Sequence, residues 1–511
     1  MLPRPSRPAR VLAVLTGLSL AVGGCSLPGS QKTATSTTSA AGMPSHSPDL
    51  AKFYSQTIDW QKCGRFQCGE LLVPVDYDKP TGETIKLALK RQRSTSRSRA
   101  GSLVINPGGP GASGVDFVED FAPTVAGNVQ RHYDIVSFDP RGVARSHPVT
   151  CLDAKEMDTF LGQDPTPDDQ SEREQMMAQN KKFADACKQR TGDLIAHVST
   201  VEAAKDMDVL RAAIGDPKLN YYGASYGTFL GATYAGLFPK HVGRVVLDGV
   251  IDPAQDGKQS ALGQATGFER ATRAYMEHCV GTGQCPLGKT VDEAMQGLSD
   301  FLKQVDAKPI DARGIGTGTL TEGWASLGLA LPMYSSELWP DLDQALIAAK
   351  QDNGQPLMRL AMQYADRNDD GTYKGNMLQA INAVNCLDRP TPGGADTFAQ
   401  EEKDFTAAAP VWGRFMAWGE SVCGPWPVTG KGKAEPIKAT GSGPIVVLGT
   451  TRDPATPYEN SVALAKALDE GVLVTREGDG HTAYQQGNNC IDRLVDDYLV
   501  KDKVPSDGAR C

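Results

Sequence analysis

The chain has 511 residues, and 52 lysine and arginine residues against 61 aspartate and glutamate residues give it a formal net charge of −9. This acidic balance argues against a nucleic-acid-binding protein, which normally carries a basic patch. Hydrophobic residues make up 40% of the chain, which excludes collagen-like and wholly disordered classes. The length suits two or three domains, or one large α/β domain with an insertion.

The N-terminus has the pattern of an export signal. Arginines without nearby acids precede an apolar stretch from Val11 to Val22, which is too short to span a bilayer and suits a signal-peptide core. Gly23-Gly24-Cys25 follows and resembles a bacterial lipobox, in which the cysteine becomes the lipid-modified N-terminus. We therefore expect a signal peptide over 1–24 and a lipid on Cys25 that anchors the exported protein to the cell membrane. An ordinary secretory signal with a chance cysteine is the alternative.

A flexible tether is expected over 25–50, because this segment has no aromatic residue and almost no charge and cannot bury a core. The chain has 11 cysteines, so an even number remains once Cys25 is set aside. In an exported chain these cysteines indicate disulfides. Sequence leaves the connectivity open, and pairing nearest neighbours gives Cys63–Cys68, Cys151–Cys187, Cys279–Cys285, Cys386–Cys423 and Cys490–Cys511. A metal site is the alternative, but the seven histidines show no ligand spacing beside cysteine, so we expect no metal and no cofactor.

Short apolar runs that end in glycine-rich loops are typical of buried parallel strands. The runs are 71–75, 84–89, 102–105, 133–138, 218–222, 245–247, 445–449 and 472–474. Helical spacing of apolar residues occurs over 201–214 and 228–238. Strands and helices in alternation predict a doubly wound, mostly parallel α/β sheet.

One motif carries the main chemical signal. Gly223-Ala224-Ser225-Tyr226-Gly227 stands between the expected strand at 218–222 and the expected helix at 228–238. In this strand–turn–helix setting, G-x-S-x-G forms a strained turn that exposes the serine hydroxyl. The glycines leave room for the neighbouring strand and helix, and the helix N-terminus supplies N–H groups for a reacting carbonyl. Ser225 is therefore the predicted nucleophile, with a structural serine in a tight turn as the alternative.

A serine nucleophile needs a base, and in this architecture an acid and then a histidine follow the serine along the chain. His481 comes directly after the strand at 472–474, whereas the other histidines precede the serine turn, follow it too closely or lie in the tether. The carboxyl ends of parallel strands are where such sheets build their sites. His481 is therefore the predicted base.

The orienting acid is less well determined by the sequence. Asp453 follows the strand at 445–449, in the position that the chain order requires. Asp248 and Asp252, which follow the strand at 245–247, compete with it for the same role.

Several motifs together resemble one family. They are Asn106–Gly111, Asp139–Arg141, Gly223–Gly227, Asp248–Val250, Asp453–Pro457 and Gly480-His481. In combination they are similar to the exported tripeptidyl aminopeptidases, serine exopeptidases of the α/β-hydrolase fold that are related to prolyl iminopeptidases. The resemblance extends over about residues 55–511. It implies Ser225, Asp453 and His481 as the triad, and a C-terminal region from about Trp412 that the family treats as a unit.

The loop Pro107-Gly108-Gly109-Pro110-Gly111 departs at its first residue from the His-Gly-Gly-Pro-Gly form of the prolyl iminopeptidases. The oxyanion hole survives this change, because backbone N–H groups form it. Gly109 and Tyr226 are the predicted donors, and Gly108 is the alternative to Gly109. Glycines that only shape a loop are the remaining alternative.

An α/β-hydrolase domain over 51–253 and 441–511 leaves 254–440 as an insertion between two strands, and we expect it to form a helical cap. A cap excludes large folded proteins and favours short chain ends. An aminopeptidase also binds the substrate ammonium group, for which Asp388 is the favoured candidate, since Asn385-Cys386-Leu387-Asp388 resembles a family motif. The other candidate carboxylates are Glu322, Glu337 and Asp341.

The sequence thus predicts a membrane-anchored exported serine exopeptidase that releases short N-terminal fragments, of tripeptide type, from peptides. Its expected partners are a peptide substrate and, through Cys25, a lipid bilayer, with no nucleic acid. An esterase or lipase would use the same triad and elbow, and a non-catalytic solute-binding lipoprotein is the third possibility.

Overall fold

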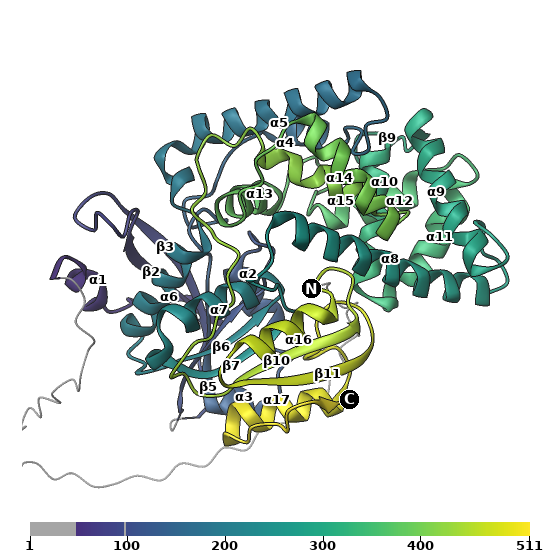
Figure 1. Ribbon diagram of the computed structural model, residues 1–511. Coiled ribbons are helices and arrows are strands. Elements are labelled where there is room, and N and C mark those ends of the chain that lie inside the picture. The colour runs from purple at the N-terminus through teal and green to yellow at the C-terminus, as the bar shows by residue number, and fades with distance from the viewer. Residues whose placement is uncertain (1–47, 97–98) are drawn as a thin grey trace, which may run out of the picture.

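A computed structural model describes residues 48–96 and 99–511 (Figure 1). The predicted signal peptide, Cys25 and all but the last residues of the predicted tether lie outside the described residues. None of the helices in the described ranges combines the length and the apolar character that crossing a membrane requires.

In the described part of the chain, ten strands form one sheet in the order β1-β2-β3-β5-β4-β6-β7-β10-β11-β12. The strands are β1 (Gln61–Cys63), β2 (Phe66–Pro74), β3 (Thr84–Gln92), β4 (Gly101–Asn106), β5 (Tyr133–Phe138), β6 (Leu219–Ala224), β7 (Val242–Asp248), β10 (Ile445–Arg452), β11 (Gly471–Asp479) and β12 (Ala509–Arg510). Strands β1, β2, β3 and β5 pair antiparallel, and every later pairing is parallel. This arrangement confirms the predicted doubly wound, mostly parallel sheet.

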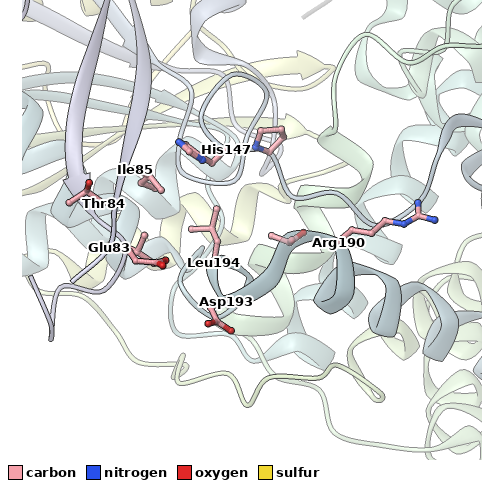
Figure 2. A pocket seen from close by; sticks show the side chains of 10 residues that line it. Glu83, Thr84, Ile85, His147, Arg190, Asp193 and Leu194 are labelled. Atoms are coloured by element: carbon pink, nitrogen blue, oxygen red, sulfur yellow. The ribbon is translucent and has the colours of Figure 1, made fainter.

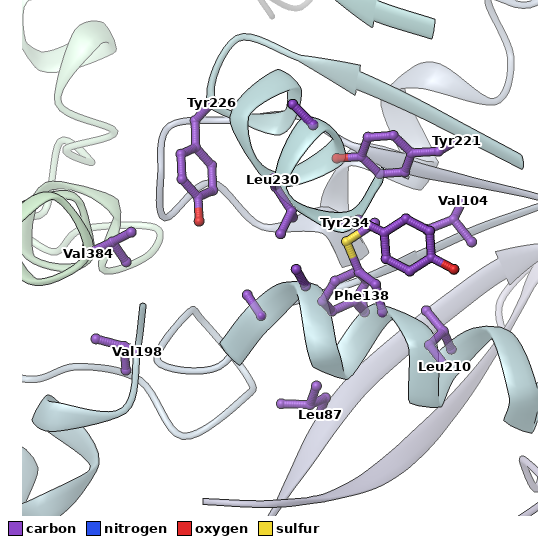
Figure 3. Packing of buried hydrophobic residues seen from close by; sticks show 14 of the residues in the cluster. Leu87, Val104, Phe138, Val198, Leu210, Tyr221, Tyr226, Leu230, Tyr234 and Val384 are labelled. Carbon is purple, nitrogen blue, oxygen red and sulfur yellow. The ribbon is translucent and has the colours of Figure 1, made fainter. Parts of the chain in front are cut away.

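Helices cover both faces of the sheet, because alternate residues along each strand point to opposite faces. One face packs against α1 (Ala51–Tyr54), α6 (Thr200–Ala213), α7 (Tyr226–Leu237) and α16 (Tyr458–Ala467). The other face packs against α2 (Gly114–Phe121), α3 (Gly127–His132) and α17 (Asn489–Lys501). Figure 3 shows Leu210 and Leu230 of the first layer gathered with Val104 and Phe138 of the sheet, all fully buried. Burying such a side chain contributes roughly 1.5–3 kcal/mol.

A second, helical layer lies beyond the carboxyl ends of the parallel strands (Figure 1). Between β7 and β10 it holds α8 (Gly257–Gly281), α9 (Val291–Ala307), β8 (Ile310–Asp311), β9 (Thr319–Leu320), α10 (Glu322–Ala330), α11 (Trp339–Ala349), α12 (Gln355–Tyr364), α13 (Met377–Asp388), α14 (Ala395–Ala408) and α15 (Gly413–Gly419). Many of their apolar residues form a separate core around Trp324 and Leu342. The boundaries 254–440 for a cap remain a prediction.

An earlier segment also joins this helical layer. Helices α4 (Ala154–Leu161) and α5 (Gln170–Thr191) follow β5, and α5 packs against α14 and the turn that contains Cys423. The expected hydrolase domain over 51–253 includes this segment, because its position before the serine elbow gives no sign of where it packs.

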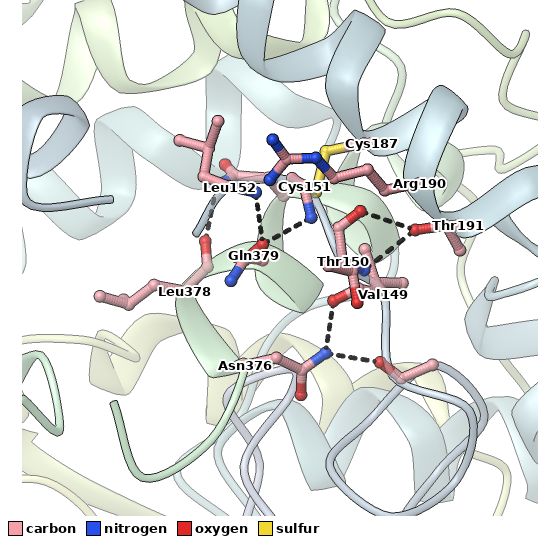
Figure 4. The surroundings of a disulfide bond; sticks show 12 residues. Val149, Thr150, Cys151, Leu152, Cys187, Arg190, Thr191, Asn376, Leu378 and Gln379 are labelled. Atoms are coloured by element: carbon pink, nitrogen blue, oxygen red, sulfur yellow. Dashed lines mark hydrogen bonds between the residues drawn. A yellow bond between two sulfur atoms is a disulfide. The ribbon is translucent and has the colours of Figure 1, made fainter. Parts of the chain in front are cut away.

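The disulfides follow the predicted nearest-neighbour scheme. In the described ranges, bonds join Cys63–Cys68, Cys151–Cys187, Cys279–Cys285, Cys386–Cys423 and Cys490–Cys511. Figure 4 shows that the bond between Cys151 and Cys187 ties the loop after β5 to α5. Beside it, the side chain of Gln379 on α13 accepts the N–H groups of Cys151 and Leu152. This loop is therefore held to both parts of the helical layer.

Candidate active site

Ser225 lies on the turn between β6 and α7, with a φ of 55° and a ψ of −125°. A residue other than glycine rarely adopts a positive φ, and such strain is often found at functional sites. The flanking glycines allow it: a Cβ on Gly223 would stand 2.3 Å from the carbonyl oxygen of Gly227, and one on Gly227 would stand 2.9 Å from Oδ1 of Asn106. The predicted nucleophile elbow is therefore present.

Asp453 and His481 form a direct pair beyond the ends of β10 and β11. Nδ1 of His481 lies 2.9 Å from Oδ1 and 2.9 Å from Oδ2 of Asp453. Asp453 is fully buried, and its carboxylate also accepts the backbone N–H groups of Ala455, Thr456 and Thr482. A carboxylate acceptor places the ring proton on Nδ1, which leaves Nε2 free to take a proton.

The two competing acids have other partners. Asp248 is fully buried at the end of β7 and accepts the N–H groups of Ala483 and Tyr484. Asp252 accepts the N–H of Ala254 two residues further on. Neither carboxylate has a hydrogen bond to the His481 ring in the described part of the chain, so the geometry favours Asp453 as the orienting acid.

The end of β7 lies against both the serine turn and His481. The N–H of Ser225 donates to the carbonyl oxygen of Asp248 over 2.8 Å, and a Cβ on the next residue, Gly249, would stand 3.2 Å from Cε1 of His481. Within residues 48–96 and 99–511, no hydrogen bond joins the Ser225 hydroxyl to His481. Catalytic hydrogen bonds of this kind are often long before substrate binds.

The glycine-rich loop after β4 lies directly against the elbow. A Cβ on Gly108 would stand 2.6 Å from the carbonyl oxygen of Ala224, and the N–H of Gly108 is taken by Oδ1 of Asn106 at 3.0 Å. Among the described residues, no acceptor takes the N–H of Gly109 or of Tyr226. Two free donors next to the nucleophile suit an oxyanion hole, and the bond from Gly108 to Asn106 disfavours Gly108 as the alternative donor.

The helical layer contacts both sides of the site. The carbonyl oxygen of Tyr334 accepts the N–H of His481 over 3.0 Å, and the two rings meet edge-on at 5.3 Å. On the other side, a Cβ on Gly111 would stand 2.9 Å from Cβ of Ala380 on α13. Tyr334 belongs to no motif, so nothing in the sequence points to it.

Asp388 is 6% exposed, and both of its oxygens accept hydrogen bonds from Thr200, one from the backbone N–H and one from the hydroxyl. Burial raises the pKa of Asp388 to about 6. The Thr200 hydroxyl lies 2.6 Å from that of Tyr226, so this carboxylate supports the residue after the nucleophile. Its role as an ammonium ligand stays a prediction.

The other candidate carboxylates lie apart from the triad contacts. Glu322 is 5% exposed and accepts the Thr166 hydroxyl, and burial raises its pKa to about 8. A carboxyl that is largely protonated at neutral pH is a poor ligand for an ammonium group. Glu337 and Asp341 are exposed.

A surface cavity of about 620 Å³ lies where the start of β3 faces the end of α5. Figure 2 shows Thr84, Ile85, His147 and Leu194 around it. The triad residues are not among those that line the cavity, so it is separate from the reacting centre.

The chain is similar to several known hydrolases. Residues 409–511 match the family described as TAP-like protein. The chain is 37% identical to serine protease Hip1 of Mycobacterium tuberculosis, covering 89% of this chain and 91% of that protein. It is 35% identical to carboxylesterase B of Mycobacterium tuberculosis, with 88% and 89% covered. It is 31% identical to tripeptidyl aminopeptidase of Streptomyces lividans, with 89% and 86% covered.

Among solved structures, proline iminopeptidase of Mycobacterium smegmatis matches with 13% sequence identity and a TM-score of 0.33, covering 84% of this chain and 98% of that one. The family match begins at residue 409, close to the C-terminal unit that the resemblance implied from about Trp412.

Proposed function

Because the chain belongs to the tripeptidyl aminopeptidase family of α/β-hydrolases and is a serine hydrolase, we propose that it releases short N-terminal fragments, of tripeptide type, from peptides. The observation that carries the proposal is the pair of His481 and Asp453, joined at 2.9 Å, beside the strained elbow of Ser225. Such a constellation is suited to acyl transfer through a covalent intermediate.

In the proposed mechanism, His481 takes the proton of the Ser225 hydroxyl while the serine oxygen attacks the peptide carbonyl. The N–H groups of Gly109 and Tyr226 donate to the oxyanion that forms. His481 then protonates the leaving amine, and the C–N bond breaks to give an acyl-enzyme. A water molecule, deprotonated by His481, attacks the ester and frees Ser225. Asp453 keeps the Nδ1 proton in place throughout.

Support for the cleavage of chain ends comes from the helical layer. Tyr334 contacts the base, and α13 lies against the glycine-rich loop, so helices approach the site from two sides. A covered site of this kind suits a short, flexible substrate better than a folded protein.

An esterase is the second candidate, and the similarity to a protein named carboxylesterase B favours keeping it. It would use Ser225, His481 and Asp453 in the same roles. Ester hydrolysis differs because an alcohol leaves more readily than an amine, so protonation by His481 matters less.

The test is a comparison of fluorogenic substrates on the purified enzyme. Tripeptidyl amides with a free N-terminus are expected to be turned over faster than the same amides with an acetylated N-terminus. Fatty-acyl esters serve as the comparison set. Turnover of esters alone would favour the esterase, and turnover of neither would leave the third possibility, a binding lipoprotein.

We further propose that the chain is exported and held at the membrane by a lipid on Cys25. The support is the signal-like sequence before Cys25 and the five disulfides of the described residues, which are typical of proteins that mature outside the cytoplasm. Cys25→Ala is expected to move the enzyme from the membrane fraction to the soluble fraction, with labelling of Ser225 unchanged. Retention of this variant in the membrane fraction would contradict the anchor.

A further inference from the structure

Asp248, at the end of β7, bonds to the backbone of the serine turn and to the backbone of the loop after His481. The Asp248 side chain is 0% exposed, so each of its polar atoms needs a protein partner. Its Oδ1 accepts the N–H of Ala483 at 2.8 Å, and its Oδ2 accepts the N–H of Tyr484 at 2.9 Å and the hydroxyl of Tyr222 at 3.0 Å. The carboxylate thus bonds to the backbone of the loop two and three residues after His481.

The backbone of Asp248 also bonds to Ser225. Its carbonyl oxygen accepts the N–H of Ser225 over 2.8 Å, at the residue whose φ of 55° marks the strained turn. Asp248 therefore bonds to the serine elbow on one side and to the histidine loop on the other. No second residue in the described ranges bonds in this way to both Ser225 and the segment 481–484.

The loop that carries His481 needs such restraint. It connects β11 to α17 without regular structure, and Thr482 and Gln485 have positive φ values of 69° and 64°. Conformations of this kind persist only where surrounding contacts over-determine them. Other contacts fix the loop at or before Thr482. Asp453 bonds to the His481 ring and to the N–H of Thr482, and the N–H of His481 donates to Tyr334. The side chains of Thr450 and Arg476 donate to the carbonyl oxygen of Thr482, and the Thr456 hydroxyl lies 3.2 Å from Nδ1 of His481. The contacts of Asp248 fix the two residues that follow Thr482.

We propose that Asp248 is a positioning residue for the reaction. Its carboxylate fixes the loop after His481 and its backbone carbonyl oxygen fixes Ser225, so that the base and the nucleophile keep their relative position. This inference rests on the proposed function, in which Ser225 and His481 are nucleophile and base. In the described ranges the Asp248 carboxylate has no hydrogen bond to the His481 ring, so it acts through the backbone N–H groups of Ala483 and Tyr484. Its position directly after the strand at 245–247 is what makes it a competitor for the acid role in the sequence.

The test is Asp248→Asn, which keeps the shape and removes the charge. An amide has one acceptor oxygen, so whichever way it is oriented its NH₂ group faces a backbone N–H of the loop, and one bond becomes a repulsion. We expect kcat to fall about 10²-fold, as for a displacement of about 1 Å at a catalytic group. KM should stay unchanged, and the rate of labelling by a fluorophosphonate should fall by the same factor as kcat.

Two control variants separate positioning from stability. Asp208→Asn changes another carboxylate that is 0% exposed, on α6, where it accepts hydrogen bonds from Tyr234 and Arg211, which lie outside the segment 481–484. It should lower the unfolding temperature and leave kcat and the labelling rate unchanged. Tyr222→Phe removes one donor and keeps both bonds to the loop, so its kcat should remain within about threefold of wild type.

The outcomes are distinct. If Asp248→Asn keeps kcat and labelling rate within twofold while it lowers the unfolding temperature like Asp208→Asn, the positioning role is overturned. If Asp248→Asn does not fold, Asp248→Glu supplies the measurement, because it keeps the charge and both acceptors but pushes the loop outward by one methylene. A Glu variant with wild-type kcat would equally overturn the proposal. Labelling that survives Ser225→Ala would instead defeat the proposed function itself.

Discussion

Ser225→Ala is expected to abolish covalent labelling by a fluorophosphonate probe and to reduce kcat on peptide amides about 10⁶-fold. The probe forms a bond to an activated serine oxygen, and alanine has none. The elbow should survive the change, because the N–H of Ser225 rather than its hydroxyl bonds to Asp248. Labelling of the purified protein, read by gel fluorescence and mass spectrometry, measures the first effect.

A serine away from the elbow supplies the control for this experiment. The hydroxyl of Ser442, in the loop before β10, donates to the carbonyl oxygen of Gly443. Ser442→Ala should therefore be labelled at the wild-type rate. Labelling of Ser225→Ala at any residue with comparable speed would show that the nucleophile has been assigned wrongly.

Asp453→Asn is expected to lower kcat about 10⁴-fold, the size of effect seen when a triad acid becomes an amide. Both oxygens of Asp453 accept hydrogen bonds from backbone N–H groups as well as from His481. If the amide NH₂ faces the ring, it donates to Nδ1 and forces the proton onto Nε2. A ring protonated on Nε2 cannot accept the proton of Ser225, so the base is lost.

The comparison of Asp453→Asn with Asp248→Asn tests the assignment of the acid. Steady-state kinetics on the same substrate should show a loss about 10²-fold larger for Asp453→Asn, because Asp453 bonds to the ring itself and Asp248 bonds to the backbone beyond it. Equal losses in the two variants, or a larger loss at Asp248, would mean that Asp248 serves as the orienting acid once substrate is bound.

Much of this arrangement could be predicted from sequence because its determinants are local. The elbow needs glycine at fixed offsets from Ser225, because a Cβ on Gly223 would stand only 2.3 Å from the carbonyl oxygen of Gly227. The disulfides join neighbours along the chain, such as Cys63 with Cys68, because closing a short loop restricts the chain least. The order of serine, acid and histidine follows from a parallel sheet whose strand ends share one edge.

The contacts of the cap, in contrast, could not be predicted. Helix α5 joins the helical layer although it precedes the elbow, and Tyr334 reaches His481 from a segment without any motif. Such contacts depend on how surfaces of elements far apart in the chain fit together, and periodicity describes only one element at a time.

The sequence by itself therefore determined the sheet, the elbow and the histidine, since each has a local or topological signature. The tertiary structure alone decided which donors each carboxylate meets. Asp453, Asp248 and Asp388 are all buried, and each was a plausible acid or ligand from its position in the chain. They differ in the donor that lies within about 3 Å. Asp453 bonds to His481, Asp248 to the loop after His481, and Asp388 to Thr200. A carboxylate takes its function from the donors around it, and folding brings those donors from distant parts of the chain.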